Sequence, residues 1–168
     1  MKTDPVQVRE VMADEYDAAG RVTLEAYAHL PGAHMSDDYA TELVDVQRRA
    51  AEAVVLVAVD GEAVVGAVTY VPDATSPWAE DLRDGEVGIR MMAVSPAAQG
   101  RGIGGALIAA CIARARAEGR SAVFLHSTPW MTTAHRVYER VGFARVPERD
   151  WLPVPDIPLL AFRLELDR

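Results

Sequence analysis

EVGIRMMAVSPAAQGRGIGGALIAACIARARAEG, residues 86–119, predicts a strand, a glycine-rich turn and a helix in succession. The strand covers residues 87–94 and the turn covers residues 99–105. The start of a helix has free backbone N–H groups and the positive end of the helix dipole, so it suits a phosphate anion. Glycines let a ligand approach the backbone because no Cβ stands in the way, and Arg101 adds positive charge there. The apolar stripe of the helix is Ile103, Leu107, Ile108, Cys111, Ile112 and Ala115.

The composition of the 168 residues is that of a globular protein, with 50% hydrophobic residues and a net charge of −8. The length suits one domain over residues 1–168. The acidic balance argues against a nucleic-acid partner and favours cationic substrates such as amines, although simple solubility would also explain it.

Several features predict a cytoplasmic protein. The single cysteine, Cys111, excludes an internal disulfide framework, fits a reducing compartment and reads as a small core residue. No Cys/His cluster has zinc-ligand spacing, so no metal is expected. No apolar run approaches the ~20 residues of a membrane span, and the first residues lack signal-peptide or transit-peptide character.

Upstream of residue 86, the pattern predicts a strand, two helices and a hairpin. Residues 6–11 alternate as a strand does. Asp14 can cap a helix that runs to about residue 29, and Ser36 can cap a second one that runs to about residue 50. Asp60-Gly61, between residues 54–59 and 63–71, is a strong hairpin signal.

Downstream of residue 119, residues 122–126 predict a strand, and Thr128-Pro129 predicts the start of a helix that ends at Gly142. Residues 143–146 and 159–166 predict strands, and the three prolines of residues 151–158 indicate a rigid loop. The expected order is β-α-α-β-β-β-α-β-α-β-β. This is an α/β arrangement, with helices covering a mixed, largely antiparallel sheet that contains one parallel pair across the glycine-rich turn and its helix.

The turn also satisfies the dinucleotide fingerprint, as Gly100-x-Gly102-x-x-Gly105. A dinucleotide site requires an acidic residue at the end of the next strand, about 20 residues on. Here that strand ends at His126-Ser127, with no Asp or Glu, and no run of parallel βαβ units follows. The fingerprint alone is a weak signal, and the dinucleotide interpretation is disfavoured.

A second pattern is more specific. Gln99-x-x-Gly102-x-Gly104 after a strand resembles the acyl-CoA pyrophosphate loop of the GNAT superfamily of N-acetyltransferases. About 35 residues further on, AHRVYERVGF at residues 134–143 resembles the A-x-x-x-Y-x-x-x-G-F helix and following strand of that family. The resemblance extends over essentially the whole chain, with the first and last thirds matched by element order only. It implies a GNAT-like acyl-CoA N-acyltransferase fold.

The resemblance implies an acetyl-CoA site built from three segments. In this family the central strand carries a bulge and splays from the next strand, so that its backbone can pair with the pantetheine arm. The family often has Asn where this chain has Met131, so Thr132 or Thr133 would have to supply that hydrogen bond. The expected contacts are Met92, Ala93 and Val94 for pantetheine, Gln99, Gly100, Arg101, Gly102, Ile103, Gly104 and Gly105 for the pyrophosphate, and Met131, Thr133 and Arg136 on the opposite side.

The resemblance also suggests the catalytic groups. Tyr138 matches the family tyrosine and would protonate the departing thiolate, although its place on a helical stripe also fits a core residue. Glu86 begins the central strand, where the family often places a base that acts directly or through water. A solvated strand-end glutamate is the alternative. His126 ends a strand that faces the expected slot and is the rival base, against an ordinary hydrogen-bonded histidine.

These features predict an N-acetyltransferase that moves the acetyl group of acetyl-CoA to a primary amine, by direct attack in a ternary complex. The expected partner is a small-molecule amine, with a homodimer suggested only by analogy. The alternatives are a peptide or protein N-terminal acetyltransferase, which needs an open groove between the Pro31 loop and residues 153–158, and a CoA-binding module without catalysis. The acceptor-site candidates are His29, His34, Trp78, Trp130 and Trp151, with a structural role as the favoured alternative for each tryptophan.

Overall fold

A computed structural model of the chain describes residues 5–30 and 35–167. Pro31 and His34, named above for the acceptor region, lie outside the described residues. No helix in the described ranges is both long enough and apolar enough to span a lipid bilayer. The elements are β1 (Gln7–Glu10), η1 (Ala13–Glu15), α1 (Tyr16–Ala28), α2 (Asp37–Val44), α3 (Val46–Glu52), β2 (Val54–Asp60), β3 (Ala63–Val71), β4 (Glu86–Val94), η2 (Pro96–Ala98), α4 (Ile103–Ala117), β5 (Ala122–Ser127), α5 (Thr132–Val141), β6 (Ala144–Arg145), η3 (Pro147–Arg149), β7 (Trp151–Val154) and β8 (Ile157–Glu165).

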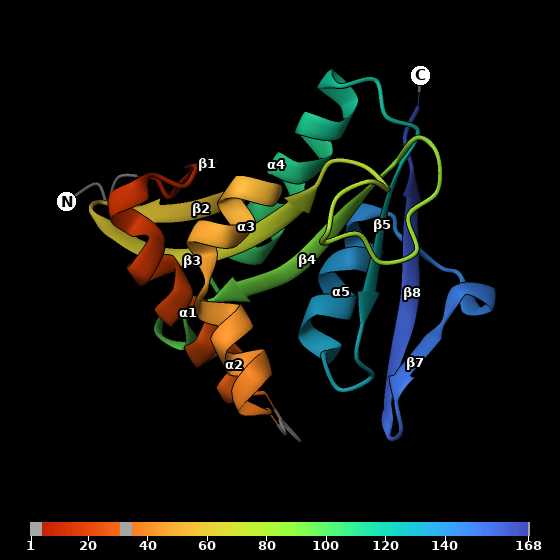
Figure 1. Cartoon of the computed structure of the whole chain (residues 1–168). Helices are drawn as coiled ribbons and strands as arrows, with labels where there is room; N and C mark the ends of the chain where they lie inside the picture. Colours follow the sequence, from red (N-terminus) through yellow and green to blue (C-terminus); the bar gives the residue numbers. More distant parts are fainter. Residues whose placement is uncertain (1–4, 31–34, 168) are drawn as a thin grey trace.

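The strands form a mixed sheet in the order β1-β2-β3-β4-β5-β8-β6, with β7 paired to β8 at one edge. Every pair is antiparallel except β4 with β5, which are parallel and are connected through α4. The α/β class and the single parallel pair predicted from the sequence are therefore confirmed. In Figure 1, α1, α2 and α3 lie over one face of the sheet, and α4 and α5 lie behind the other.

Alternation along β2 explains the two layers. Leu56 and Ala58 point to the face covered by α4 and share a core with Leu107 and Ile108. The intervening valines point to the opposite face and pack against the first helices of the chain. All six residues of the predicted α4 stripe are buried, including Cys111, so the helical period was interpreted correctly. Burial raises the pKa of the Cys111 thiol to about 12, as expected for an inert core residue.

The central strand β4 carries a bulge and then leaves its neighbour. Thr69 of β3 faces Arg90, but Ala67 faces Ala93, so β4 has one more residue than β3 between these two pairs. Met91, inside this segment, has φ 52°. On the other side, β4 pairs with β5 only over the three residues 86–88, and beyond that point the two strands diverge (Figure 1). The bulge and the splay expected from the family resemblance are both present.

The single helix predicted from Ser36 to about residue 50 is in fact two helices, α2 and α3. Asp45, at φ −82° and ψ 66°, leaves the helical region between α2 and α3. Its carboxylate accepts the backbone N–H of Arg48 at 3.2 Å and so caps α3. Arg49 is buried, and its guanidinium donates to two carbonyls in the last turn of α2. The break is stable because one side chain caps the new helix while another satisfies the end of the old one.

The helix predicted to begin at Pro129 begins instead at Thr132, so the proposed cap was wrong. Residues 128–131 close a turn, in which Met131 N–H donates to the carbonyl of Thr128 at 3.2 Å. Because the Thr128 backbone closes this turn, its side chain is not placed to cap α5. Its Oγ1 is buried without a hydrogen-bond partner among the described residues.

Residues 151–158, predicted as a rigid loop, form the hairpin of β7 and β8. Val154 pairs with Ile157 around Pro155 and Asp156, and Asp156 has φ 73°. Proline followed by a residue with positive φ is a turn arrangement. Pro153 is tolerated because β7 is an edge strand that pairs only with β8, so a missing N–H leaves no central ladder incomplete. The prolines shape a hairpin here and do not prevent strand pairing.

Candidate functional site

The glycine-rich turn brings uncapped backbone N–H groups to the start of α4. Gly100 and Gly102 have φ 83° and 76°, and Gly102 is an N-cap residue without a side-chain hydrogen bond. The first intrahelical bond runs from Ala106 N–H to the Gly102 carbonyl at 3.0 Å, so the N–H groups before Ala106 have no acceptor inside the helix. A Cβ added at Gly100, Gly102 or Gly105 would meet no atom within 4 Å. The turn therefore leaves room for an anion at the positive end of a dipole.

The charge expected at this turn is partly neutralised. Arg101 Nη1 lies 3.0 Å from Oδ2 of Asp60, the last residue of β2. Both side chains are partly exposed, so the pair contributes little to stability and can open to admit another anion.

The end of β4 lies next to this turn. A Cβ added at Gly104 would contact the side chains of Met92 and Val94 at 3.8 Å. Thus two of the three segments expected to hold acetyl-CoA, the end of β4 and the start of α4, are neighbours. In the third segment Thr133 and Arg136 are exposed and Met131 is half-buried.

Tyr138, on α5, has a buried ring within an aromatic cluster. Its centroid lies 5.4 Å from that of Phe162 and 5.7 Å from that of Phe143. Burial raises the pKa of the Tyr138 phenol above its ordinary value, so the group stays protonated across the neutral range. The ring thus has the core position that the helical stripe predicted, and its hydroxyl has the protonation state that a proton donor requires.

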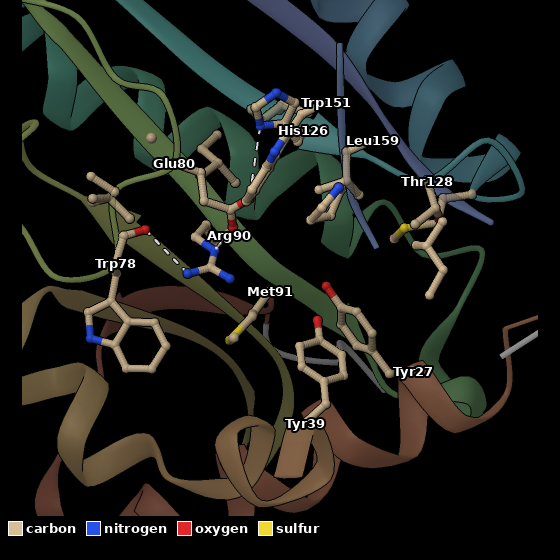
Figure 2. A pocket seen from close by; sticks show the side chains of 18 of the residues that line it. Tyr27, Tyr39, Trp78, Glu80, Arg90, Met91, His126, Thr128, Trp151 and Leu159 are labelled. Carbon is tan, nitrogen blue, oxygen red and sulfur yellow. Dashed lines mark hydrogen bonds and ion pairs between the residues drawn. The ribbon is translucent and has the colours of Figure 1, made fainter. Parts of the chain in front are cut away.

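A cavity of about 720 Å³ opens where β4 and β5 diverge. Residues 88–91 and 124–126 line it from the two strands, and α1, α2, the loop before β4 and the β7–β8 hairpin complete its walls. Much of the lining is aromatic. Figure 2 shows the hydroxyls of Tyr27 and Tyr39 directed into the space opposite His126 and Trp151. The aromatic residues of the lining are Tyr27, Tyr39, Trp78, Phe124, Trp130 and Trp151.

Three polar side chains meet in this cavity. Arg90 Nε forms an ion pair with Glu80 Oε1, and Arg90 Nη1 donates to the Trp78 carbonyl at 3.3 Å. The other carboxylate oxygen, Glu80 Oε2, lies 3.9 Å from His126 Nδ1. The second ring nitrogen, His126 Nε2, lies 3.0 Å from the Arg149 carbonyl. Figure 2 shows Glu80 between the histidine and the arginine.

Glu86 lies outside the cavity lining, in a buried ion cluster. Its carboxylate accepts two bonds from Arg149, at 2.7 and 2.9 Å, and one from Arg163 at 3.0 Å. Burial alone would raise the pKa of Glu86, but the bonds from Arg149, from the Arg83 backbone N–H and from Arg163 outweigh it and lower the pKa to about 2. A carboxylate with so low a pKa is a weak base at neutral pH, so the geometry argues against the base role predicted for Glu86.

Of the three polar side chains that meet in the cavity, the sequence singled out His126 and missed Glu80 and Arg90. Glu80 lies in a loop without a recognisable motif, so no periodic signal marked it. Arg90 and Tyr39 gave a weak signal, because Arg90 shares a strand face with Gly88 and Tyr39 begins a helical stripe. Trp78, Trp130 and Trp151 were acceptor-site candidates, and all three line the cavity. His29 is exposed at the end of α1, and its Nδ1 lies 2.8 Å from the Glu25 carbonyl.

Comparison with known proteins identifies the family. The family model described as Acetyltransferase (GNAT) family matches residues 14–143. The chain belongs to the GNAT acetyltransferase family. As a member of this family it is an acyltransferase enzyme, which sets aside the dinucleotide interpretation and the non-catalytic module. No curated protein matches the chain by sequence.

Solved GNAT structures share the fold over their full length. The chain is similar to yncA from Salmonella typhimurium, solved with acetyl-CoA, with a TM-score of 0.73 and 21% identity over 98% of this chain and 96% of that one. A GNAT acetyltransferase from Staphylococcus aureus Mu50 has a TM-score of 0.75 and 13% identity, with coverage of 97% and 100%. A ribosomal-protein-alanine N-acetyltransferase from Brucella melitensis has a TM-score of 0.69 and 19% identity, with coverage of 95% and 99%.

Within the residues that the structure describes, no group of three His, Cys, Asp or Glu side chains is arranged to hold a metal ion.

Proposed function

We propose that this GNAT enzyme transfers the acetyl group of acetyl-CoA to the primary amine of a small molecule. The observation that carries the proposal is the position of β4. Residues 92 and 94, at its end, adjoin the uncapped start of α4, whereas residues 88–91 line the aromatic cavity. One bulged strand therefore connects an anion site to an acceptor cavity, as a reaction between a phosphate-bearing donor and a second substrate requires.

The residues at the start of α4 fit the pyrophosphate of acetyl-CoA. Glycines with positive φ, open space at three Cβ positions and a first helical turn without acidic residues make an anion cradle. In this proposal the backbone of residues 92–94 holds the pantetheine arm, residues 99–105 hold the pyrophosphate, and Met131, Thr133 and Arg136 lie on the other side. When bound, acetyl-CoA supplies the activated acetyl group.

Tyr138 supplies the proton that the leaving sulfur takes up. Its raised pKa keeps the hydroxyl protonated until it is needed, and the surrounding rings fix its position. Glu86 serves the site indirectly in this proposal. Its cluster with Arg149 and Arg163 ties the start of β4 to η3 and β8, and so fixes the strand that carries both substrates.

The acceptor is a compact amine with an apolar or aromatic body. A cavity of about 720 Å³ is within the usual range for small-molecule sites, and its aromatic lining suits apolar carbon and the face of a cation. The carboxylate of Glu80 and the net charge of −8 both favour a positively charged amine.

Gly105→Glu is expected to weaken acetyl-CoA binding while it leaves the fold intact or more stable. A new carboxylate in the first turn of α4 is favourable for the helix dipole and replaces a poor helix former, but it repels a pyrophosphate. Relative to Gly105→Gln, which has the same shape without the charge, we expect a Kd for acetyl-CoA at least about tenfold higher. Calorimetric titration measures Kd, and thermal unfolding measures stability. Equal Kd values for the two variants at low salt would place the pyrophosphate elsewhere.

Release of free CoA from acetyl-CoA across a panel of amines tests the function. We expect the highest kcat/KM for a primary amine with an aromatic or branched aliphatic body, with lower values for polyamines and aminoglycosides. Turnover of short peptides in preference to every small amine would favour the peptide N-terminal alternative. Tight binding of acetyl-CoA without turnover of any amine or peptide would contradict the proposed reaction.

A further inference from the structure

The geometry points to a proton-accepting pair in the cavity, in which Glu80 binds the ammonium group of the acceptor and His126 receives its proton. The inference rests on the proposed function and names the base for that reaction. It assigns a role to two side chains from separate elements, Glu80 in the loop before β4 and His126 on β5. Both line the cavity that opens where β4 and β5 diverge, and there they face each other.

The hydrogen bond at Nε2 fixes the state of the His126 ring. A carbonyl oxygen only accepts, so the 3.0 Å contact with the Arg149 carbonyl requires a proton on Nε2. In the neutral ring Nδ1 then carries a lone pair. The side chain of His126 is only 4% exposed, and Nδ1 has no hydrogen-bond partner among residues 5–30 and 35–167. A buried acceptor without a donor is costly, which indicates that a proton belongs there during the reaction.

The two oxygens of Glu80 have separate tasks. Arg90 pairs with Oε1 and holds the carboxylate in place, so Oε2 is left toward His126 Nδ1. Glu80 is the more accessible member of the pair, with a side chain 21% exposed, and it lines the cavity. An ammonium group in the cavity therefore meets the more exposed Glu80 first, with the less exposed His126 beside it.

The remaining charges around His126 are already paired. Arg149, whose carbonyl contacts Nε2, directs its guanidinium to Glu86 and Asp81. Asp150 is bonded to Arg145, and Arg90 is bonded to Glu80. The rings of Phe124 and Trp151 pack against the imidazole at centroid distances of 5.0 and 6.1 Å. Next to His126 on β5, Ser127 Oγ lies 3.1 Å from Nε2 of His135, which is on α5. Glu80 is thus the carboxylate positioned to stabilise a proton on Nδ1.

The proton transfer is balanced as follows. One N–H bond of the acceptor ammonium breaks, Glu80 Oε2 takes the proton, and Glu80 passes it to the lone pair of His126 Nδ1. Glu80 is a carboxylate again, and His126 is an imidazolium ion next to it, an attraction that draws the 3.9 Å contact closer. The lone pair released on the amine nitrogen attacks the acetyl carbonyl carbon as the C–S bond breaks, and the sulfur takes its proton from Tyr138. The new amide nitrogen then loses its second proton, which returns through solvent to the Tyr138 oxygen. Solvent later removes the proton from Nδ1.

Two variants and a pH profile test the pair. For Glu80→Gln, whose amide oxygen can still accept from Arg90, and for His126→Gln, we expect kcat/KM near neutral pH to fall about 100-fold, with acetyl-CoA affinity unchanged. The loss should be smaller at high pH, where the amine is already neutral in solution, and smaller for weakly basic amines than for strongly basic ones. The control is His29→Gln, because His29 is exposed at the C-cap of α1 and is not among the residues that line the cavity, so this variant should keep the wild-type profile.

Imidazole ¹⁵N spectra of the ligand-free enzyme provide a readout that does not depend on turnover. We expect neutral His126 to carry its proton on Nε2. The inference is overturned by a proton on Nδ1 of the neutral ring, or by an active wild type whose two variants stay within about threefold of it at every pH. A wild type that is inactive on every amine, with the expected tautomer present, contradicts the proposed function and not the state of the pair.

Discussion

Glu86→Ala is expected to lower the free energy of unfolding by about 3–5 kcal/mol, because it leaves the buried guanidinium of Arg149 without its main partner. Arg149 also packs over the ring of Phe124, with its Cζ 3.6 Å from the centroid, so it cannot turn to solvent without disturbing β5. Urea unfolding at neutral pH measures the change. The control is Glu62→Ala, an exposed position in the β2–β3 turn, where we expect less than about 0.5 kcal/mol.

The same cluster predicts how stability depends on pH. The pKa of Glu86 is about 2 in the folded protein and near the ordinary glutamate value in the unfolded chain. Its contribution, of order 3 kcal/mol, is complete above the unfolded value and is lost as the pH falls from about 5 toward 2. Unfolding measured at several pH values should therefore show a steeper acid loss for the wild type than for Glu86→Gln.

Activity separates this anchoring role from the base role. If Glu86 is an anchor, folded Glu86→Gln enzyme assayed below its melting temperature should keep kcat within about tenfold of wild type. A loss of 100-fold or more, with stability unchanged, is what a general base would show. That result would restore Glu86 as the base and would contradict the assignment to Glu80 and His126.

Tyr138→Phe is expected to lower kcat by about 100-fold or more while the Kd for acetyl-CoA stays within about threefold. The substitution removes one hydroxyl and keeps the ring that packs on Phe143 and Phe162, so the fold should be preserved. Single-turnover kinetics with a good acceptor would place the loss in the chemical step, because sulfur that leaves as a thiolate is a poorer leaving group than sulfur that is protonated as it leaves.

A second buried tyrosine provides the matched control. Tyr70 is fully buried on β3, and its hydroxyl donates to Glu118 Oε2 at 2.6 Å, among residues that do not line the cavity. Tyr70→Phe should cost about 1 kcal/mol of stability and leave kcat unchanged. If Tyr138→Phe behaves like Tyr70→Phe, Tyr138 is a core residue only, and the proton donor must be sought elsewhere.

Local chemistry made much of the fold predictable. Asp60-Gly61 marks a hairpin locally: Asp60 pairs with Ala63, so the turn is Gly61-Glu62, and Gly61 at its first position has φ 62°. The glycines before α4 and the apolar stripe behind them specify a strand–turn–helix unit in the same local way. The errors occurred where local signals conflicted with pairing. The prolines of residues 151–158 suggested a loop, but an edge strand tolerates them, and Thr128 resembled a cap although its backbone was committed to a turn.

The functional site, like the fold, has features set by local sequence and features set by long-range contacts. The family, the glycine-rich turn before α4 and the buried tyrosine of α5 could be predicted without the structure, because each is written in a short motif or a helical period. The partners of the two carboxylates, Glu86 and Glu80, depend on contacts between distant parts of the chain. Glu86 meets an arginine 63 residues away, and Glu80 meets a histidine on another strand. These partners are chosen by how β4 and β5 pair over three residues and then separate, and such long-range geometry leaves no periodic trace in either segment.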